Sequence, residues 1–77
     1  MDAKTRPLAV VTGASSGIGF ELAVQCARHG FDLVIAADRP LDDAVGTLRA
    51  YRAEVEPVQA DLATVEGVER LVAAVGD

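Results

Sequence analysis

Short apolar runs alternate along the chain with longer segments that mix apolar and polar positions. Leu8-Ala9-Val10-Val11 is a run of the kind that is buried on both faces of a parallel sheet. Residues 20–29 contain neither proline nor glycine. Near the C-terminus, apolar side chains recur at helical spacing, at Val68, Leu71, Val72 and Val75. The pattern predicts three strands, at about 8–12, 32–37 and 55–60, each followed by a helix, at about 17–29, at about 41–52 and from Thr64 onward.

Residues at the segment boundaries support these limits. Gly30 follows the first helix as a C′ residue, and Thr64 is a suitable N-cap for the third. Pro57 interrupts the third strand, where a missing N–H is tolerated if the strand lies at the edge of the sheet. Gly46 lies in the middle of the second helix and costs about 1 kcal/mol relative to alanine, so this helix is the least favourable. The polar residues 1–6 are expected to be loose.

Strands connected by helices pair in parallel through right-handed crossovers. The predicted fold is therefore an α/β half-fold, with a three-stranded parallel sheet in the order 3-2-1 and three helices. The 77 residues supply no fourth strand, so we expect the apolar edge of the first strand to be exposed. For the same reason, the third helix should lack the strand that would fix its position. We expect self-association through the edge of the first strand, or by exchange of elements with a second copy.

A glycine-rich turn, Thr12-Gly13-Ala14-Ser15-Ser16-Gly17-Ile18-Gly19, connects the first strand to the first helix. A strand, a glycine turn and a helix in this order direct free backbone N–H groups, and the positive end of the helix dipole, at a phosphate. Glycine allows the backbone to approach closely and to adopt positive φ, and Ser15 and Ser16 add hydroxyl donors. We interpret the turn as a cradle for the pyrophosphate of a nucleotide.

The spacing T-G-x-x-x-G-I-G resembles the cofactor loop of the short-chain dehydrogenase/reductase family. Gly30, the strand 32–37 and Asp61-Leu62 continue the resemblance over nearly the whole chain. The resemblance implies a Rossmann-type dinucleotide-binding domain. Because such domains run to about 250 residues, residues 1–77 are expected to be a single, truncated, amino-terminal part of one. The implied activity of the parent protein is hydride transfer between a nicotinamide and a carbonyl or alcohol.

The resemblance also implies that residues closing the second strand choose between NAD and NADP. An acid there accepts hydrogen bonds from the ribose hydroxyls and repels a 2′-phosphate, which a nearby arginine attracts. The family's usual acidic position falls on Ala37, and Asp38 lies one residue beyond. NADP-preferring relatives often have arginine where Asp38 stands and a basic residue where Ser16 stands, so NAD is slightly favoured. Arg39 keeps NADP open, and Asp38 is alternatively a turn former before Pro40.

Two further positions match the family's cofactor contacts. By resemblance, the Asp61 carboxylate accepts from the adenine amino group and the Leu62 N–H donates to the ring; alternatively, Asp61 only begins the loop to the third helix. Ile18 resembles the residue under the nicotinamide end of the cofactor, or else packs in the first helical turn. The candidate cofactor-binding residues are Gly13, Ser15, Ser16, Gly17, Ile18, Gly19, Asp38, Arg39, Asp61 and Leu62.

Catalysis in the family uses a serine, a tyrosine and a lysine four positions after the tyrosine. Tyr51, expected on the second helix, is followed at that position by Val55, so it is not the catalytic tyrosine. With no catalytic residue among its 77 residues, the chain is expected to be inactive alone. The alternative is a natural non-catalytic nucleotide-binding or assembly module.

Other chemistry fits the same residues less well. Residues 13–17 match the G-x-S-x-G turn of α/β-hydrolases, but that chemistry needs an acid and then a histidine later in the chain. The single histidine, His29, is expected at the far end of the adjoining helix. The turn is not a P-loop, because no Lys-Ser/Thr pair follows its glycines. Cys26 is interpreted as a small core residue, and no cluster has metal-ligand spacing.

The composition of the chain argues against two classes of binding partner, nucleic acid and membranes, and bears on the expected cellular location. The formal net charge of −5 argues against nonspecific binding to nucleic acid and supplies no basic patch for a membrane surface. No apolar run approaches the ~20 residues that span a bilayer, and the N-terminus lacks the apolar core of a signal peptide. A single cysteine excludes an internal disulfide and fits a reducing compartment, so the expected location is cytoplasmic. A chain of this length has a marginal core.

Overall fold

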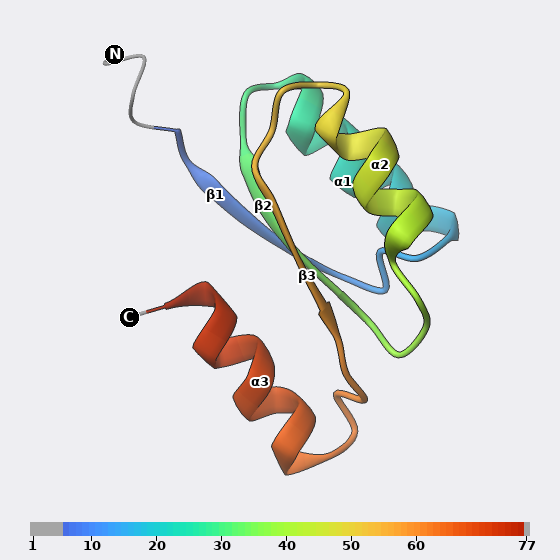
Figure 1. Cartoon of the computed structure of the whole chain (residues 1–77), viewed down its shortest axis with the longest axis vertical. Coiled ribbons are helices and arrows are strands. Elements are labelled where there is room, and N and C mark those ends of the chain that lie inside the picture. The colour runs from blue at the N-terminus through green and yellow to red at the C-terminus, as the bar shows by residue number, and fades with distance from the viewer. Residues whose placement is uncertain (1–5, 77) are drawn as a thin grey trace.

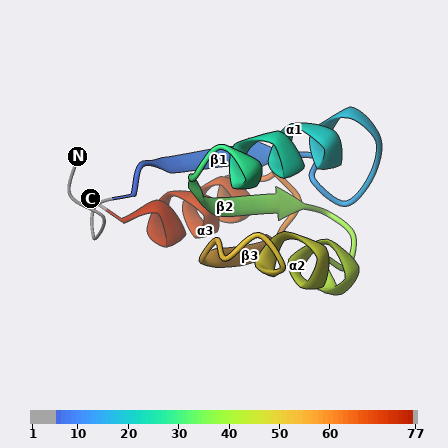
Figure 2. The same ribbon diagram turned by 90° about the horizontal axis from the view of Figure 1, so that it is seen from above.

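The computed structural model describes residues 6–76, in which strands and helices alternate as the sequence predicts (Figure 1). The elements are β1 Leu8–Thr12, α1 Gly17–Arg28, β2 Asp32–Ala37, α2 Asp42–Arg49, β3 Val55–Gln59 and α3 Val65–Val75. Both strand pairings are parallel, and β2 lies between β1 and β3 (Figure 2). The predicted sheet order is confirmed.

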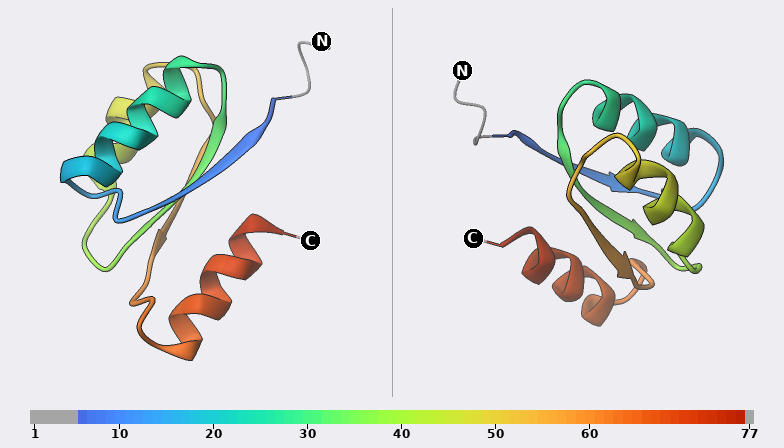
Figure 3. Two further views of the ribbon diagram at one scale, coloured as in Figure 1. Left: turned by 180° about the vertical axis from the view of Figure 1, so that it is seen from behind. Right: turned by 45° about the horizontal axis from the view of Figure 1, so that its top comes forward.

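The helices lie on opposite faces of the sheet, with α1 and α2 on one side and α3 on the other (Figure 3). Because side chains alternate along a strand, Leu33 and Ile35 of β2 face α1 and α2, where they join the larger core cluster. Val34 and Ala36 face α3 in a smaller cluster. Half-buried Cys26 packs against the larger cluster, which confirms its predicted place.

The second helix is shorter than predicted. It ends at Arg49 rather than Arg52, and residues 50–52 form a turn in which Arg52 has a φ of 66°. A left-handed backbone conformation cannot continue an α-helix, so Tyr51 lies in this turn and not on the helix. The first helix ends at Arg28 with His29 as its C-cap, followed by Gly30 at a φ of 89°.

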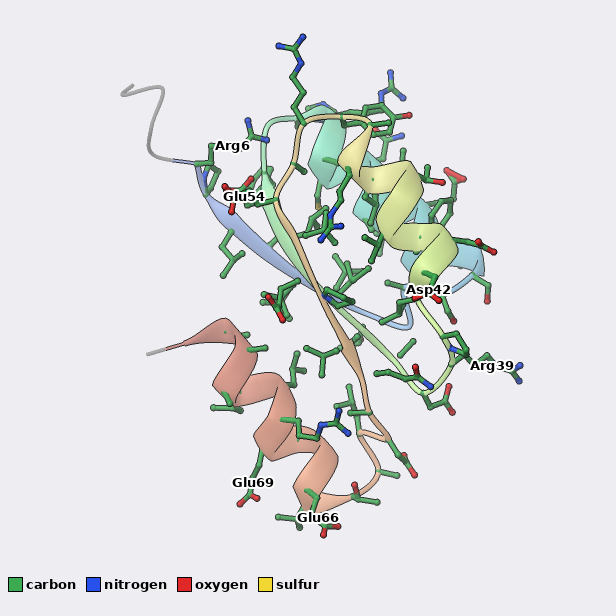
Figure 4. All side chains as sticks on the ribbon, viewed as in Figure 1. Arg6, Arg39, Asp42, Glu54, Glu66 and Glu69 are labelled. Carbon is green, nitrogen blue, oxygen red and sulfur yellow. The ribbon has the colours of Figure 1, made fainter. Side chains whose placement is uncertain are left out.

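A single carboxylate oxygen joins the strands at the amino end of the sheet. Asp32 Oδ1 accepts from Arg6 Nε at 2.8 Å and from the backbone N–H of Glu54 at 3.0 Å. Figure 4 shows Arg6 and Glu54 at this end. The expectation that residues 1–6 are loose is therefore wrong for Arg6. Residues 1–5 lie outside the part of the chain that the structure describes.

The α3 face of the sheet is only partly covered. Leu71 of the predicted apolar stripe is half-buried, but its other members are exposed, at Val68, Val72 and Val75. On β1, Leu8 and Val10 are 47% and 45% exposed. The expected exposure of the first strand is confirmed, because α3 packs over β2 and β3 and leaves β1 uncovered.

Candidate functional site

The carboxyl ends of the three strands open into one cleft of about 270 Å³. The turn after β1 and the end of β2 are joined by the hydrogen bond from Ala14 N–H to Ala36 C=O, at 3.2 Å. The turn after β3 joins them through Ala60 N–H, which donates to Ala37 C=O at 2.9 Å. The cleft is lined by Gly13, Ser15, Ala37, Asp38, Ala60, Asp61, Leu62 and Ala63.

Glycines shape the turn between β1 and α1. Gly13 and Gly17 have φ values of 67° and 62°, which side chains rarely tolerate. A Cβ on either would meet no atom within 4 Å, so backbone conformation rather than crowding requires glycine there. Gly19 differs, because a Cβ on it would overlap the carbonyl group of Gly13. The first turn of α1 therefore rests directly on the glycine turn.

The start of α1 has free donors and carries no negative charge. Ser16 is the N-cap, with extended backbone, but its side chain makes no capping hydrogen bond, and the first turn has no acidic residue. By contrast, α2 has Asp42 and Asp43 in its first turn, and α3 has Glu66. Unpaired N–H groups at the positive end of a helix dipole suit an anion. This end of α1 fits the phosphates of a nucleotide.

The turn after β3 is held by hydrogen bonds of Asp61. Its Oδ1 accepts from Ala63 N–H at 2.9 Å, and its backbone carbonyl accepts from Thr64 Oγ1 at 2.8 Å. Thr64 Oγ1 in turn accepts from Gly67 N–H at 3.0 Å, which confirms the predicted N-cap. Asp61 thus begins the loop to α3, and it also lines the cleft.

Gly67 is a contributor that the sequence interpretation missed. It is buried in the first turn of α3, where a Cβ would overlap the carbonyl group of Asp61. The available signal was a glycine three residues after the predicted N-cap Thr64, a helical position where glycine is unfavourable. The small side chains of Ala37, Ala60 and Ala63, which line the cleft, were also not predicted as site residues.

The structure brings together half of the candidate residues. Gly13, Ser15, Asp38, Asp61 and Leu62 line the cleft.

The other candidates lie beside or away from the cleft. Ser16, Gly17 and Gly19 belong to the start of α1. Ile18 is 80% exposed there, so the alternative that it packs in the first turn is wrong. Arg39 is exposed and points away from the sheet (Figure 4).

A second hollow of about 270 Å³ lies at the amino end of the sheet. Its walls include the carboxylates of Asp32, Glu54 and Glu56, and no glycine turn borders it. Its three acids repel a phosphate, and it lacks the glycine turn and the uncapped start of α1 that lie at the cleft, which has two acids. The hollow at the carboxyl end is therefore the candidate nucleotide site.

Two other kinds of feature were sought within residues 6–76. No three His, Cys, Asp or Glu side chains gather closely enough there to hold a metal ion. No helix in this part of the chain has the length and apolar character needed to cross a membrane.

Similar solved structures include two reductases. L-sorbose reductase from Gluconobacter frateurii, complexed with NADPH and L-sorbose, has a TM-score of 0.88 and 37% identity, and the match covers 97% of this chain and 30% of that one. A 3-oxoacyl-[acyl-carrier protein] reductase from Brucella melitensis, in complex with NAD, has a TM-score of 0.84 and 38% identity, over 92% of this chain and 28% of that one. The half-fold is thus that of the amino-terminal part of such enzymes.

The sequence relatives agree with the structures. Peroxisomal 2,4-dienoyl-CoA reductase of Arabidopsis thaliana is 38% identical over 69 residues, which are 87% of this chain and 23% of that protein. The chain spans about a quarter of the length of that curated relative. Residues 7–77 match the family model described as short chain dehydrogenase. The chain belongs to the short-chain dehydrogenase family.

Proposed function

We propose that the cleft at the carboxyl end of the sheet binds the adenosine diphosphate half of NAD or NADP. The observation that carries this proposal is the start of α1 beside the cleft, where no side chain caps the N–H groups and the first helical turn contains no acidic residue. The L-sorbose reductase complexed with NADPH and the 3-oxoacyl reductase in complex with NAD, both similar in fold, support it.

Each part of the nucleotide would meet a different wall of the cleft. The pyrophosphate would lie against Gly13, Ser15 and the first N–H groups of α1. The ribose would lie near Asp38, and adenine near Asp61 and Leu62. The bond from Ala63 N–H occupies one lobe of the Asp61 carboxylate at Oδ1, and the rest of the carboxylate can accept from an amino group.

The residues after β2 favour NAD over NADP in this proposal. Asp38 lines the cleft, where its carboxylate would accept from ribose hydroxyls and repel a 2′-phosphate. Arg39, the cation that could attract such a phosphate, is exposed and points away from the sheet (Figure 4).

The whole protein to which this fold belongs would transfer hydride between a nicotinamide and a carbonyl or alcohol, with the nicotinamide supplying the hydride chemistry. The residues described here would bind and orient the nucleotide. The single tyrosine, Tyr51, lies in the turn before β3, at the end of the sheet opposite the cleft. We therefore expect the 77 residues alone to bind without turnover.

A matched pair of variants tests the phosphate assignment. Ser16→Asp places a carboxylate at the start of α1, and Thr64→Asp makes the same charge change at the start of α3. In calorimetric titrations with ADP-ribose, we expect Ser16→Asp to weaken binding about tenfold or more through repulsion of the phosphates. We expect Thr64→Asp, which retains a capping side chain, to stay within about twofold of the wild type.

The same titrations separate the parts of the proposal. Equal losses in the two variants, or no binding by the folded wild type, would contradict the phosphate assignment. Tighter binding of NADP than of NAD would contradict the role given to Asp38 and leave the phosphate assignment standing.

A further inference from the structure

Three arginines lie at the amino end of the sheet, on the side of α1 and α2. Helices that connect parallel strands run back along the sheet, so α1 and α2 both end there (Figure 1). Arg28 is the last residue of α1, Arg49 is the last residue of α2, and Arg52 lies in the turn before β3. Because the two helices contact each other, we call Arg28, Arg49 and Arg52 the arginine patch.

The guanidinium groups of the arginine patch are available to a ligand. All three residues are exposed. Within residues 6–76, they have no acidic partner, whereas Arg6 forms a salt bridge with Asp32. Arg49 Nη2 donates to Val55 C=O at 3.3 Å, which leaves its other N–H groups free to donate. The patch therefore presents unpaired donors and positive charge to the solvent.

The acids at this end of the sheet lie on its opposite face. Val34 faces α3. Asp32 lies two residues before Val34, and Glu56 pairs with Val34 in register, so both acids lie on that face. Glu54 lines the same hollow as these two acids and a residue of α3. The sheet thus separates the three carboxylates from the arginine patch.

The acids of the two helices lie at the far end from the patch. Glu21 precedes the last residue of α1 by seven positions, and Asp42 and Asp43 precede that of α2 by seven and six. At about 1.5 Å per residue the separation along each axis is about 9–10 Å, which exceeds the Debye length of about 8 Å at physiological salt. The patch therefore stays electropositive although the chain carries a formal net charge of −5.

Arg52 occupies a backbone conformation that glycine usually takes. Its φ is 66°, in the left-handed region that a Cβ disfavours. After α1 and α3, the chain reaches positive φ at Gly30 and Gly76 instead, with values of 89° and 91°. Compensation of helix dipoles accounts for an arginine at the end of a helix, but it does not require one in the turn beyond. A side chain kept at a strained position indicates a role other than folding.

We propose that the arginine patch docks a short acidic segment of a partner protein. Guanidinium groups bind carboxylates through paired, charge-assisted hydrogen bonds. Tyr51, which is 41% exposed, lies between Arg49 and Arg52 in the chain and adds an aromatic surface beside the charges. The patch and the nucleotide cleft lie at opposite ends of the sheet, so the proposal does not depend on the nucleotide.

The small extent of the patch favours a short segment over a large polyanion. Packed helices are about 8–10 Å apart, so the ends of two helices meet only a few charges of a ligand. A nucleic acid or an anionic membrane would extend beyond the patch over a chain of net charge −5 and would be repelled there. A few neighbouring glutamates or aspartates would contact the patch alone.

The experiment is a fluorescence anisotropy titration of labelled hexaglutamate with the 77-residue chain. We expect saturable binding that weakens as salt is added, because exposed charges are screened. Arg52→Gln should weaken binding about threefold or more. Arg70→Gln is the matched control, because Arg70 is also exposed but lies on α3, on the other side of the sheet; its affinity should stay within about 1.5-fold of the wild type.

A second variant separates docking from folding. Arg52→Gly removes the guanidinium group and relieves the left-handed backbone conformation. Affinity for hexaglutamate should therefore fall as in Arg52→Gln, while the urea midpoint rises. Affinity for ADP-ribose should be the same in both Arg52 variants as in the wild type, because the cleft is at the other end of the sheet.

Four results would overturn the proposal. The first is no binding of hexaglutamate by the folded chain, and the second is equal affinity of the wild type and Arg52→Gln. The third is tighter binding of oligothymidylate or phosphatidylglycerol vesicles than of hexaglutamate at equal salt, which would assign the patch to nucleic acid or a membrane. The fourth is a lower urea midpoint in Arg52→Gly, which would show that Arg52 serves the fold.

Discussion

The helices α1 and α3 begin alike but leave different groups exposed. Each follows the carboxyl end of a strand through a short turn, and in each a glycine of the first helical turn contacts a backbone carbonyl of that preceding turn. In α1, Gly19 contacts the carbonyl of Gly13, and in α3, Gly67 contacts the carbonyl of Asp61. The first turn of α3 is capped by Thr64 and has an acid. The first turn of α1 has neither a side-chain cap nor an acid.

The difference separates what the fold requires from what binding requires. The close contact between a helix and its preceding turn occurs in both α1 and α3, so we attribute it to packing of the fold and not to binding. At the start of α3 a side chain takes one of the free N–H groups, that of Gly67, whereas no side chain takes an N–H group at the start of α1, where such groups suit an anion. The proposed phosphate site therefore depends on the omission of a cap and a carboxylate as much as on the glycines.

The largest expected effect tests the shared feature. Gly19→Ala and Gly67→Ala should each lower the free energy of unfolding by about 1–3 kcal/mol, because the added methyl group overlaps a backbone carbonyl. Urea unfolding followed by circular dichroism measures this. Gly46→Ala is the control: its Cβ meets nothing within 4 Å, and alanine there should add about 0.5–1 kcal/mol. A Gly67→Ala variant as stable as the wild type would show that only α1 needs the close approach.

A smaller effect tests the difference between the two helix starts. Thr64→Ala removes the acceptor for Gly67 N–H and should cost about 1 kcal/mol of stability. Ser16→Ala removes no capping hydrogen bond and should change stability by less than about 0.5 kcal/mol. Thermal unfolding of both variants gives the comparison. Equal losses would mean that Ser16 caps α1 in solution, and the contrast between the helices would disappear.

The smallest effect concerns what the α3 side contributes to binding. In Asp61→Asn the amide oxygen can still accept from Ala63 N–H, so we expect stability within about 0.5 kcal/mol of the wild type. Affinity for ADP-ribose should fall about threefold, as the loss of a charged acceptor for the adenine amino group implies. Inorganic pyrophosphate, titrated as the probe without adenine, should bind both proteins equally. Weaker pyrophosphate binding by Asp61→Asn would contradict the division of the cleft.

The positions of the strands and the glycine turn could be predicted because both depend on local sequence, and the strand order then followed from the rule for right-handed crossovers. Apolar runs, glycine spacing and the N-cap Thr64 act over a few residues. The end of α2 could not be predicted, since nothing in the sequence marks Arg52 as left-handed. The hydrogen bonds of Asp32 Oδ1 with Arg6 and Glu54 were also not predicted, because these partners are distant from Asp32 in the sequence.

The cleft shows the same limit. Parallel strands bring their carboxyl ends together, so the meeting of Gly13, Asp38 and Asp61 followed from the predicted topology. Which candidates enter the cleft depends on side-chain direction, and this the sequence does not determine: neighbouring Asp38 lines the cleft while Arg39 points away from the sheet.

The hydrogen bonds of Asp32 Oδ1 make the two ends of the sheet differ in how their segments are joined. Within residues 6–76, side-chain hydrogen bonds that cross between strands lie at the amino end. The loops at the opposite rim are joined by main-chain bonds, such as that from Ala60 N–H to Ala37 C=O, which any residue type except proline can donate. Rim side chains, and with them the nucleotide preference proposed for Asp38, can thus be exchanged without breaking the hydrogen bonds of Asp32 at the amino end of the sheet.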